Sequence, residues 1–446
     1  MSDGLTLTAI FVSNSLPSKV SFTSPLPNTQ TTNKNVTLTG KVSSTVQSPQ
    51  IVCQVFQNNS SLTGFVPATV NGATWALTVS NLTIGDYTAV AIATDATGKT
   101  TLASDKFIVN FYPRLAGLYR GLFFDPTSVA GTNAGSVEFG LGNYGEVYGS
   151  LTFGNSAAPK NPPYVLYFQM GATGSAVLQA QNALSTTGTP LPVLTINFDL
   201  TDFTGVVTGS VAIGSDVYPM TAYRAFTKLT TNTAPSPGTY TLNLEPSTTG
   251  NVPSVDSFAN VVVSAAGNLS VAGTLADNTP FSLASSVYTN GVWPVFTSFY
   301  KGNDMLIGWE TNLPSGAVTG LLYWVKNPTN GLYDTNRFSE QLNSFGAQYV
   351  APTPGSNYMI VFGGGSLESP VTNFCSFKNG VLIPASATDK LTGTVSSKGV
   401  LKGTIINPFN NEKLPFNGAF ISPTEGGGGF TLDVNKQTGF FTISAD

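Results

Sequence analysis

The residues best suited to chemistry gather between positions 288 and 324. Three of the four Trp of the chain lie in this stretch, and two acidic residues lie among the rings. Aromatic faces stack on the C–H surfaces of sugars, while carboxylates bind sugar hydroxyls. The stretch therefore predicts a carbohydrate-binding site with these candidate residues: Tyr288, Trp293, Tyr300, Asp304, Trp309, Glu310 and Trp324.

The same rings have a second interpretation, as the filling of a β-sheet. Aromatic residues are ordinary members of sheet cores and of cross-strand pairs. Tyr323 and Trp324 are neighbours in the sequence, so on a strand they point to opposite faces. This alternation favours at least one exposed ring, and both interpretations stay open.

A glycoside hydrolase is a further alternative, because it needs two carboxyl groups about 5–10 Å apart. Asp304 and Glu310 would be about 20 Å apart along one strand, so they can pair if a hairpin lies between them. Asp199 and Asp202 are better explained as flanking the turn before Gly205. The 23 acidic residues are spread almost evenly, so we expect a non-catalytic protein.

The composition excludes several classes of function. The chain of 446 residues has no His, which excludes Ser-His-Asp triads, Cys-His dyads, HExxH zinc sites and facial-triad iron. The net charge is −4 and the Lys and Arg residues are scattered, so nucleic acid is not an expected partner. We expect no cofactor; calcium at Asp86 and the 95–99 turn is the one alternative, although turns use Asp routinely.

The residue composition indicates where in or outside the cell the protein works. Cys53 and Cys375 fall in different predicted domains, and we expect two buried thiols. No window approaches about 18 apolar residues, so no transmembrane helix is expected, and residues 1–11 do not form a signal peptide. With 9% charged residues and abundant Thr, Ser, Asn and Gly, the chain suggests a secreted or cell-surface protein, and we expect the sequence to be a mature form or a fragment.

Short runs of alternating apolar and polar residues cover most of the chain. They are typical of antiparallel strands with one buried face; helical periodicity is weak, with 176–184 and 337–342 as the candidate helical turns. We predict an all-β protein, with an N-terminal Ig-like sandwich followed by Gly-rich antiparallel domains of barrel-like or sandwich form. The expected division is 1–17 as a linker or the end of a preceding surface repeat, 18–111 as the sandwich, 112–230 as a first Gly-rich domain and 231–446 as a second, larger one.

A glycine motif recurs in the Gly-rich part. Two glycines stand four residues apart and are followed by a small or apolar residue, usually after another predicted strand. We expect the first glycine in a hairpin turn, where a positive φ is needed, and the second within a curved strand. The copies are Gly145-Glu-Val-Tyr-Gly149, Gly205-Val-Val-Thr-Gly209, Gly316-Ala-Val-Thr-Gly320, Gly399-Val-Leu-Lys-Gly403 and, more loosely, the segment from Gly267 to Leu275.

Two resemblances to known families follow from short segments. Phe22-Thr-Ser-Pro25, Val36-Thr-Leu-Thr-Gly40, Gly85-Asp-Tyr87 and Ala93-Thr-Asp-Ala-Thr-Gly98 together resemble the bacterial Ig-like domains of surface proteins, which implies a spacer or presentation module. Gly117-Leu-Tyr-Arg-Gly-Leu-Phe123, Gly291-Val-Trp-Pro-Val295 and the region from Gly399 to Pro408 resemble the Gly-rich β domains of exported proteins of Verrucomicrobia-type bacteria. That resemblance implies an exported protein with Gly-rich β domains, and it implies no catalytic residue.

The leading prediction is a non-catalytic extracellular or cell-surface protein with a structural or adhesive role. Its expected partners are other copies of itself, or surface glycans and proteins. A low-charge surface lets copies pack closely without strong repulsion. The carbohydrate-binding protein is the first alternative, and the glycoside hydrolase is the second.

Overall fold

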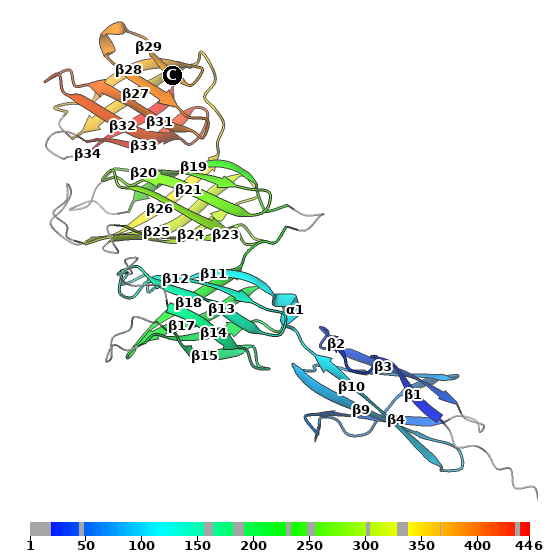
Figure 1. The fold of residues 1–446 in the computed structure, drawn as a ribbon. Coiled ribbons are helices and arrows are strands. Elements are labelled where there is room, and N and C mark those ends of the chain that lie inside the picture. Colours follow the sequence, from blue (N-terminus) through cyan, green and yellow to red (C-terminus); the bar gives the residue numbers. More distant parts are fainter. Residues whose placement is uncertain are drawn as a thin grey trace, which may run out of the picture. The chain divides into compact units, whose positions relative to one another are not determined.

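The computed structural model describes residues 19–43, 49–155, 164–181, 191–228, 233–247, 255–299, 304–327, 338–365, 367–432 and 438–446. Within these residues the protein is all-β, as predicted, apart from the short helix α1 (Tyr112–Leu115) and the 3-10 turn η2 (Ala387–Asp389). The chain divides into two compact units, the first comprising Met1–Ala116, Gly142–Gly145 and Met170–Gly174 and the second comprising the remainder. Figure 1 shows their strands.

The first unit contains a sandwich of two sheets, ordered β1-β3-β8-β7 and β2-β10-β9-β4-β5, with β6 paired to β4. The Tyr87 hydroxyl donates to the Thr83 carbonyl oxygen at 2.8 Å and accepts from the Thr83 amide at 3.0 Å. This tyrosine corner is typical of Ig-like sandwiches. The strands are β1 (Lys19–Ser24), β2 (Thr29–Thr31), β3 (Val36–Ser43), β4 (Gln50–Gln57), β5 (Ser60–Ser61), β6 (Val66–Pro67), β7 (Thr69–Asn71), β8 (Thr74–Val79), β9 (Gly85–Thr94) and β10 (Thr100–Val109).

The second unit contains two eight-stranded sheets and one closed barrel. The first sheet consists of β11 (Gly117–Phe123), β12 (Gly135–Leu141), β13 (Glu146–Phe153), β14 (Tyr164–Gln169), β15 (Ser175–Gln179), β16 (Val193–Phe198), β17 (Val206–Ile213) and β18 (Asp216–Arg224). The second sheet consists of β19 (Gly238–Pro246), β20 (Ser257–Val263), β21 (Asn268–Thr274), β22 (Pro280–Ser286), β23 (Val292–Phe299), β24 (Asp304–Asn312), β25 (Ala317–Lys326) and β26 (Phe338–Gln348). The closed barrel consists of β27 (Asn357–Gly364), β28 (Val371–Lys378), β29 (Val381–Pro384), β30 (Thr392–Val395), β31 (Val400–Ile406), β32 (Lys413–Phe420), β33 (Glu425–Leu432) and β34 (Thr438–Ala445).

The two sheets share one topology. Each is a meander whose first strand also pairs with its last, β11 with β18 and β19 with β26, so the sheet ends lie at β14 and β15 or at β22 and β23. In the second sheet, buried side chains from all eight strands form one core, so the sheet curls around its own interior. The range 231–446, expected as one domain, thus holds a sheet and a separate barrel.

The glycine motif has the predicted structure. Its first glycines have positive φ at hairpin turns, for example 89° at Gly145 and 73° at Gly205. Its second glycines lie inside strands, where an added Cβ would stand 2.0 Å from the Glu138 carbonyl oxygen at Gly149 and 1.9 Å from that of Thr195 at Gly209. In both sheets the motif connects the second strand to the third and the sixth to the seventh, so each sheet consists of two similar four-stranded halves.

We predict that Gly209→Ala destabilises the first sheet, because the new methyl group would collide with the backbone of the neighbouring strand. Overpacking of this kind costs about 1–3 kcal/mol, measurable as a lower midpoint of chemical denaturation. Gly171→Ala is the matched control, since a Cβ there meets nothing within 4 Å. Equal midpoints for the two variants would contradict this role of the second glycine.

The prediction of helical turns at 176–184 and 337–342 is wrong. Residues 175–179 form strand β15, and 338–348 form strand β26. In β26, Glu340 points to the same buried face as Leu342 and Ser344. Because Glu340 and Ser344 are polar although they face the interior, this strand does not show the alternation of apolar and polar residues that predicts a strand.

Candidate functional site

The predicted sugar-binding stretch forms three consecutive strands of the second sheet, β23 to β25. Trp293 is the cross-strand partner of Glu310, and Trp324 that of Leu306. Both tryptophans are almost completely buried in the core, and the Trp293 Nε1 donates to Asn312 Oδ1 at 2.8 Å. Tyr300 lies outside the described residues.

The outer face of the same strands packs against the first sheet. Trp309 lies edge-on to Tyr223, with ring centroids 5.1 Å apart, and Tyr323 lies 5.6 Å from Phe124. Tyr288 is buried as well, and its hydroxyl donates to the backbone of the first sheet. Tyr323 and Trp324 do point to opposite faces, but both faces are packed. The interpretation of these rings as the filling of a sheet therefore holds for Trp293 and Trp324, and sugar binding by the stretch stays a prediction.

Asp304 and Glu310, considered for hydrolysis, do not form the required pair. Asp304 and Glu310 both lie on β24, with no hairpin between them, so about 20 Å of strand separates them. Asp199 accepts hydrogen bonds from the amides of Thr201 and Asp202 at 2.9 and 3.0 Å, and thus stabilises a turn, as the sequence indicated.

Glu310 is a carboxyl group enclosed within the second sheet. Burial raises its pKa from 4.5 to about 8, and the nearby Ser344 lowers it to a smaller degree. Neither Glu310 oxygen has a hydrogen bond of normal geometry among the described residues. Gly320 on β25 makes room for it, since a Cβ there would stand 2.4 Å from Glu310 Oε2. At neutral pH the group is therefore held mainly in its protonated form.

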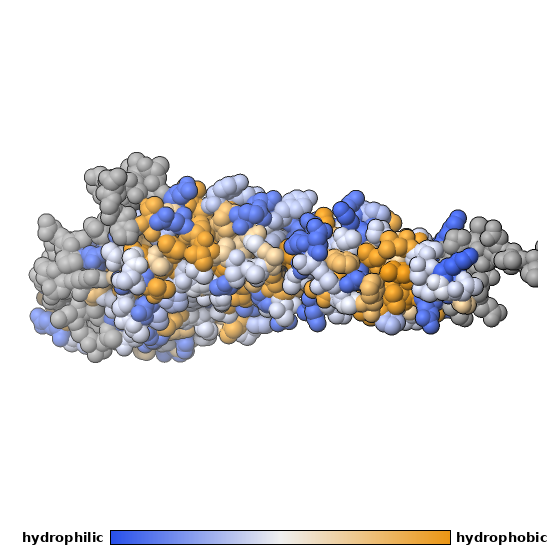
Figure 2. All heavy atoms as spheres, turned by 90° about the horizontal axis from the view of Figure 1, so that it is seen from below, coloured by the Kyte–Doolittle hydropathy of each residue, from blue (hydrophilic) through white to orange (hydrophobic). Residues whose placement is uncertain are grey.

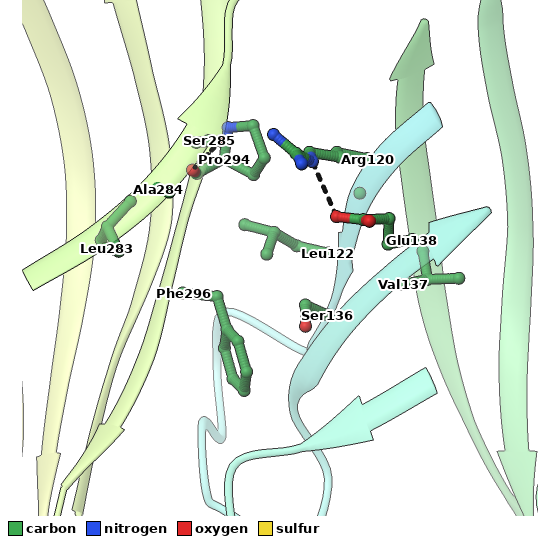
Figure 3. A pocket seen from close by; sticks show the side chains of 11 residues that line it. Arg120, Leu122, Ser136, Val137, Glu138, Leu283, Ala284, Ser285, Pro294 and Phe296 are labelled. Atoms are coloured by element: carbon green, nitrogen blue, oxygen red, sulfur yellow. Dashed lines mark hydrogen bonds and ion pairs between the residues drawn. The ribbon is translucent and has the colours of Figure 1, made fainter. Parts of the chain in front are cut away.

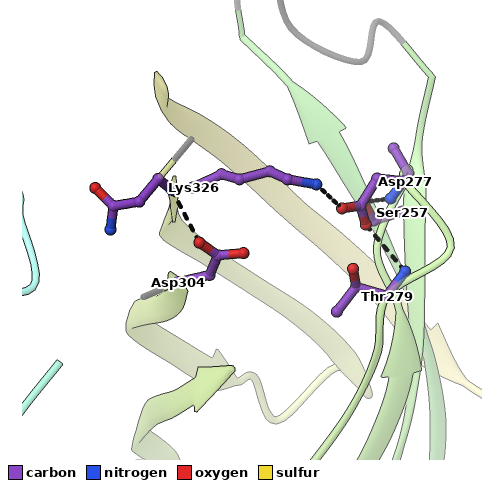
Figure 4. Close-up of polar contacts among 7 residues, drawn as sticks. Ser257, Asp277, Thr279, Asp304 and Lys326 are labelled. Atoms are coloured by element: carbon purple, nitrogen blue, oxygen red, sulfur yellow. Dashed lines mark hydrogen bonds and ion pairs between the residues drawn. The ribbon is translucent and has the colours of Figure 1, made fainter. Parts of the chain in front are cut away.

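A second polar cluster lies at one end of the same interior (Figure 4). Lys326 Nζ forms an ion pair with Asp277 Oδ2, and Asp277 Oδ1 accepts from the Thr279 amide at 2.9 Å. Asp304 Oδ1 accepts from the Asn327 amide at 2.9 Å, and burial raises the Asp304 pKa. Sequence reasoning singled out Asp304 but missed Lys326 and Asp277, since nothing local marks a partner 49 residues away.

Figure 3 shows a small cavity between the first and the second sheet. Arg120 Nε donates to Glu138 Oε2 at 2.7 Å, and its Nη1 donates to Ser286 Oγ at 2.6 Å. The cavity has a volume of about 90 Å³, with Phe296 among its lining residues. Ligand pockets typically measure about 300–1,000 Å³, so this space suits a few water molecules.

An exposed aromatic pair lies on the outer face of the first sheet. Tyr148 on β13 and Tyr167 on β14 are direct cross-strand partners, and they are 54% and 77% exposed. Their rings stack with centroids 6.4 Å apart and an interplanar angle of 14°. We call this the tyrosine face. Alternation along β13, in which Val147 and Leu151 point inward, could have identified Tyr148 as outward-facing.

Other side chains of this surface complete the tyrosine face. Gln169, on β14, and Gln179, on β15, are exposed, and both carry amide groups that bind hydroxyls. Val165 and Val177 are exposed on the same two strands. The arrangement combines flat aromatic surface with amide donors and acceptors, which suits a neutral ligand that has both C–H faces and hydroxyl groups.

The remaining sequence candidates have structural roles. Asp95 Oδ1 accepts from the amides of Thr97 and Lys99 at 2.9 and 3.0 Å, which stabilises a turn and, together with the Thr97 hydroxyl, lowers the Asp95 pKa. No group of three or more potential metal ligands occurs in the part of the chain that the structure describes. Cys53 and Cys375 are buried and free, as expected, and burial raises their pKa values to about 11 and about 12.

The comparisons with known proteins show only distant similarity. No protein family and no curated protein matches the chain. A transferrin binding protein B double mutant from Haemophilus parasuis aligns over 90% of this chain and 95% of its own, at 10% identity and a TM-score of 0.19. An I-band fragment of titin aligns over 91% and 99%, at 11% identity and a TM-score of 0.18. A Ca²⁺-stabilised, ice-binding adhesin of an Antarctic bacterium aligns over 92% and 99%, at 9% identity and a TM-score of 0.16. Similarity at this level carries no argument about function.

Proposed function

We propose that this chain is a non-catalytic adhesion protein of the bacterial cell surface, and that it binds neutral glycans through the tyrosine face. The observation that carries the proposal is the stacked, exposed pair Tyr148 and Tyr167. Cross-strand tyrosines also stabilise sheets, and Tyr148 lies beside Gly140, where a Cβ would be 3.8 Å from its ring. Packing of that kind does not require Tyr167 to be 77% exposed.

The build of the chain supports this proposal. An Ig-like sandwich acts as a spacer in exported proteins, and the Gly-rich part resembles exported proteins of Verrucomicrobia-type bacteria. With 9% charged residues, the surface suits uncharged ligands better than ionic ones. No helix of the described residues is long and apolar enough to cross a membrane.

A glycan array probed with the full chain tests the proposal. Binding to neutral glycans is expected, and Tyr148→Ser or Tyr167→Ser should weaken it about tenfold, which corresponds to about 1.4 kcal/mol. Phe374→Ser is the matched control, because it removes a ring that is 43% exposed on the closed barrel. Undiminished binding by both tyrosine variants would exclude the tyrosine face.

Self-association is a second candidate function. Strands β14 and β15 are the ends of the first sheet. Among the described residues a bridge connects Val165 on β14 to Gln181, just after β15, and sheet ends accept added strands. Figure 2 shows apolar residues gathered in patches between polar ones on one face of the molecule, as at interaction sites. Light scattering with and without calcium should show oligomers or filaments; a monomer of 46.5 kDa in both conditions would contradict self-assembly.

A further inference from the structure

The ion pair of Lys326 and Asp277 is almost completely removed from water. The side chains are 5% and 2% exposed, and they come from opposite parts of the second sheet. Lys326 ends β25, whereas Asp277 lies in the turn between β21 and β22. Figure 4 shows the lysine side chain extended toward this turn.

Each partner is held in place by its own surroundings. Asp277 Oδ1 accepts from the Thr279 amide at 2.9 Å, which leaves Oδ2 for the lysine. The Ala276 amide donates to Ser257 Oγ at 2.8 Å, so the turn is anchored to β20. The lysine Nζ stands 5.9 Å from the centre of the Trp324 ring. The amine and the carboxyl group are thus kept in contact in an apolar enclosure.

Two buried charges are costly, because their mutual attraction often does not repay the loss of hydration. Condensation into an amide removes both charges and releases one molecule of water, so no charge remains buried without hydration. We infer that Lys326 and Asp277 are joined by an isopeptide bond that the folded chain forms by itself.

The reaction balances without any co-reactant. A proton passes from the ammonium to the carboxylate, and the lone pair of the neutral Nζ attacks Asp277 Cγ. The Nζ–Cγ bond forms and one Cγ–O bond breaks. The departing oxygen leaves as water with the carboxyl proton and one further proton from the nitrogen. The contact between Nζ and Oδ2 places the amine directly beside the carboxyl group whose Cγ it attacks, so no diffusion of the two groups is needed.

Asp304 is another buried acidic group close to this pair. Its carboxyl accepts from the amide of Asn327, the residue after Lys326, and its charge interacts with both Lys326 and Asp277. The hydrogen bond from the Asn327 amide to Asp304 Oδ1 therefore fixes the end of β25 that carries Lys326. We assign it this positioning role in bond formation.

The bond would close the second sheet covalently. Residues 277 and 326 are 49 positions apart, and β22 and β23, which lie between them in the sequence, are the two ends of the sheet. A cross-link from the β21–β22 turn to the end of β25 would join the two halves of the sheet and resist unfolding under pulling force; its use to the protein rests on the proposed adhesive function.

Mass spectrometry of the intact, denatured full chain tests the inference directly. The protein should be one water lighter than its sequence, about 18 Da, and trypsin should leave a linked peptide that contains both residues. Lys326→Arg should restore the full mass, because a guanidinium is not a nucleophile at neutral pH, and Asp277→Asn should lose ammonia instead of water. Lys402→Arg, on the closed barrel, should keep the deficit.

A wild-type chain at its full sequence mass would overturn the inference, whatever the variants show. A deficit mapped to a peptide without Lys326 would overturn it as well. Asp304→Asn should slow the reaction, so that freshly made protein contains the full-mass form. If the Asp304→Asn variant formed the bond at the wild-type rate, Asp304 would have no role in bond formation.

Discussion

Replacing Glu310 with Gln is expected to stabilise the second sheet at alkaline pH and to leave its stability unchanged at acidic pH. Glu310 is enclosed by the sheet, and burial raises its pKa from 4.5 to about 8. Gln keeps the shape of the protonated acid but cannot ionise. The variant therefore removes the cost of burying a carboxylate.

The sign of the pH dependence follows from proton binding. Between pH 4.5 and about 8, the folded state holds a proton at Glu310 that the unfolded state has released. The stability contributed by this group is therefore complete below pH 4.5 and is lost as the pH rises toward 8. The loss should amount to several kcal/mol, and Glu310→Gln should abolish it.

Thermal unfolding of both proteins at pH 4 and pH 9 measures this difference. The two should unfold together at pH 4, and the variant several degrees later at pH 9. Glu340→Gln is the matched control, since Glu340 is equally buried but accepts from the Ser247 amide at 2.8 Å. If Glu310→Gln showed no advantage at pH 9, Glu310 would not be the buried acid described here.

Lys326→Met is expected to destabilise the second sheet strongly. The change leaves the Asp277 carboxylate buried without its cation, which costs about 3–5 kcal/mol. Denaturant unfolding should report it as a lower midpoint. Adding Asp277→Leu to the same chain should recover the part of the loss that comes from the unpaired buried carboxylate. The part that comes from losing the inferred cross-link should persist.

The second ion pair of the described residues provides the comparison. Arg120 and Glu138 are 25% and 51% exposed, and solvent-exposed pairs contribute at most about 1 kcal/mol. Glu138→Gln should therefore change the midpoint little. If Glu138→Gln lowered the midpoint as much as Lys326→Met does, burial would not decide how much each ion pair contributes to stability.

The sequence predicted the parts of the fold that depend on local pattern. Alternation located the sandwich strands, and the glycine spacing located the hairpins, because turn geometry and close strand approach demand glycine at fixed positions. It did not separate the second sheet from the closed barrel. Both are built from the same kind of strand, so no change of composition marks the boundary near residue 350.

The site was harder to predict, because a curled sheet buries polar residues as well as aromatic ones. Glu310 and Trp324 were grouped for their chemistry, yet they point into one closed interior. The tyrosine face went unnoticed because 164–168 in β14 is apolar or aromatic throughout, so its sequence does not indicate which side chains face outward. That orientation depends on pairing with β13.

Hydroxyl-radical footprinting of the full chain, with and without a neutral glycan that it binds, tests the proposed function most directly. The glycan should protect Tyr148 and Tyr167 from oxidation and should leave the oxidation of Tyr288 and Trp309 unchanged. Protection of Tyr288 and Trp309 with unchanged oxidation of the tyrosine face would contradict the proposed function and would place the ligand at the 288–324 stretch.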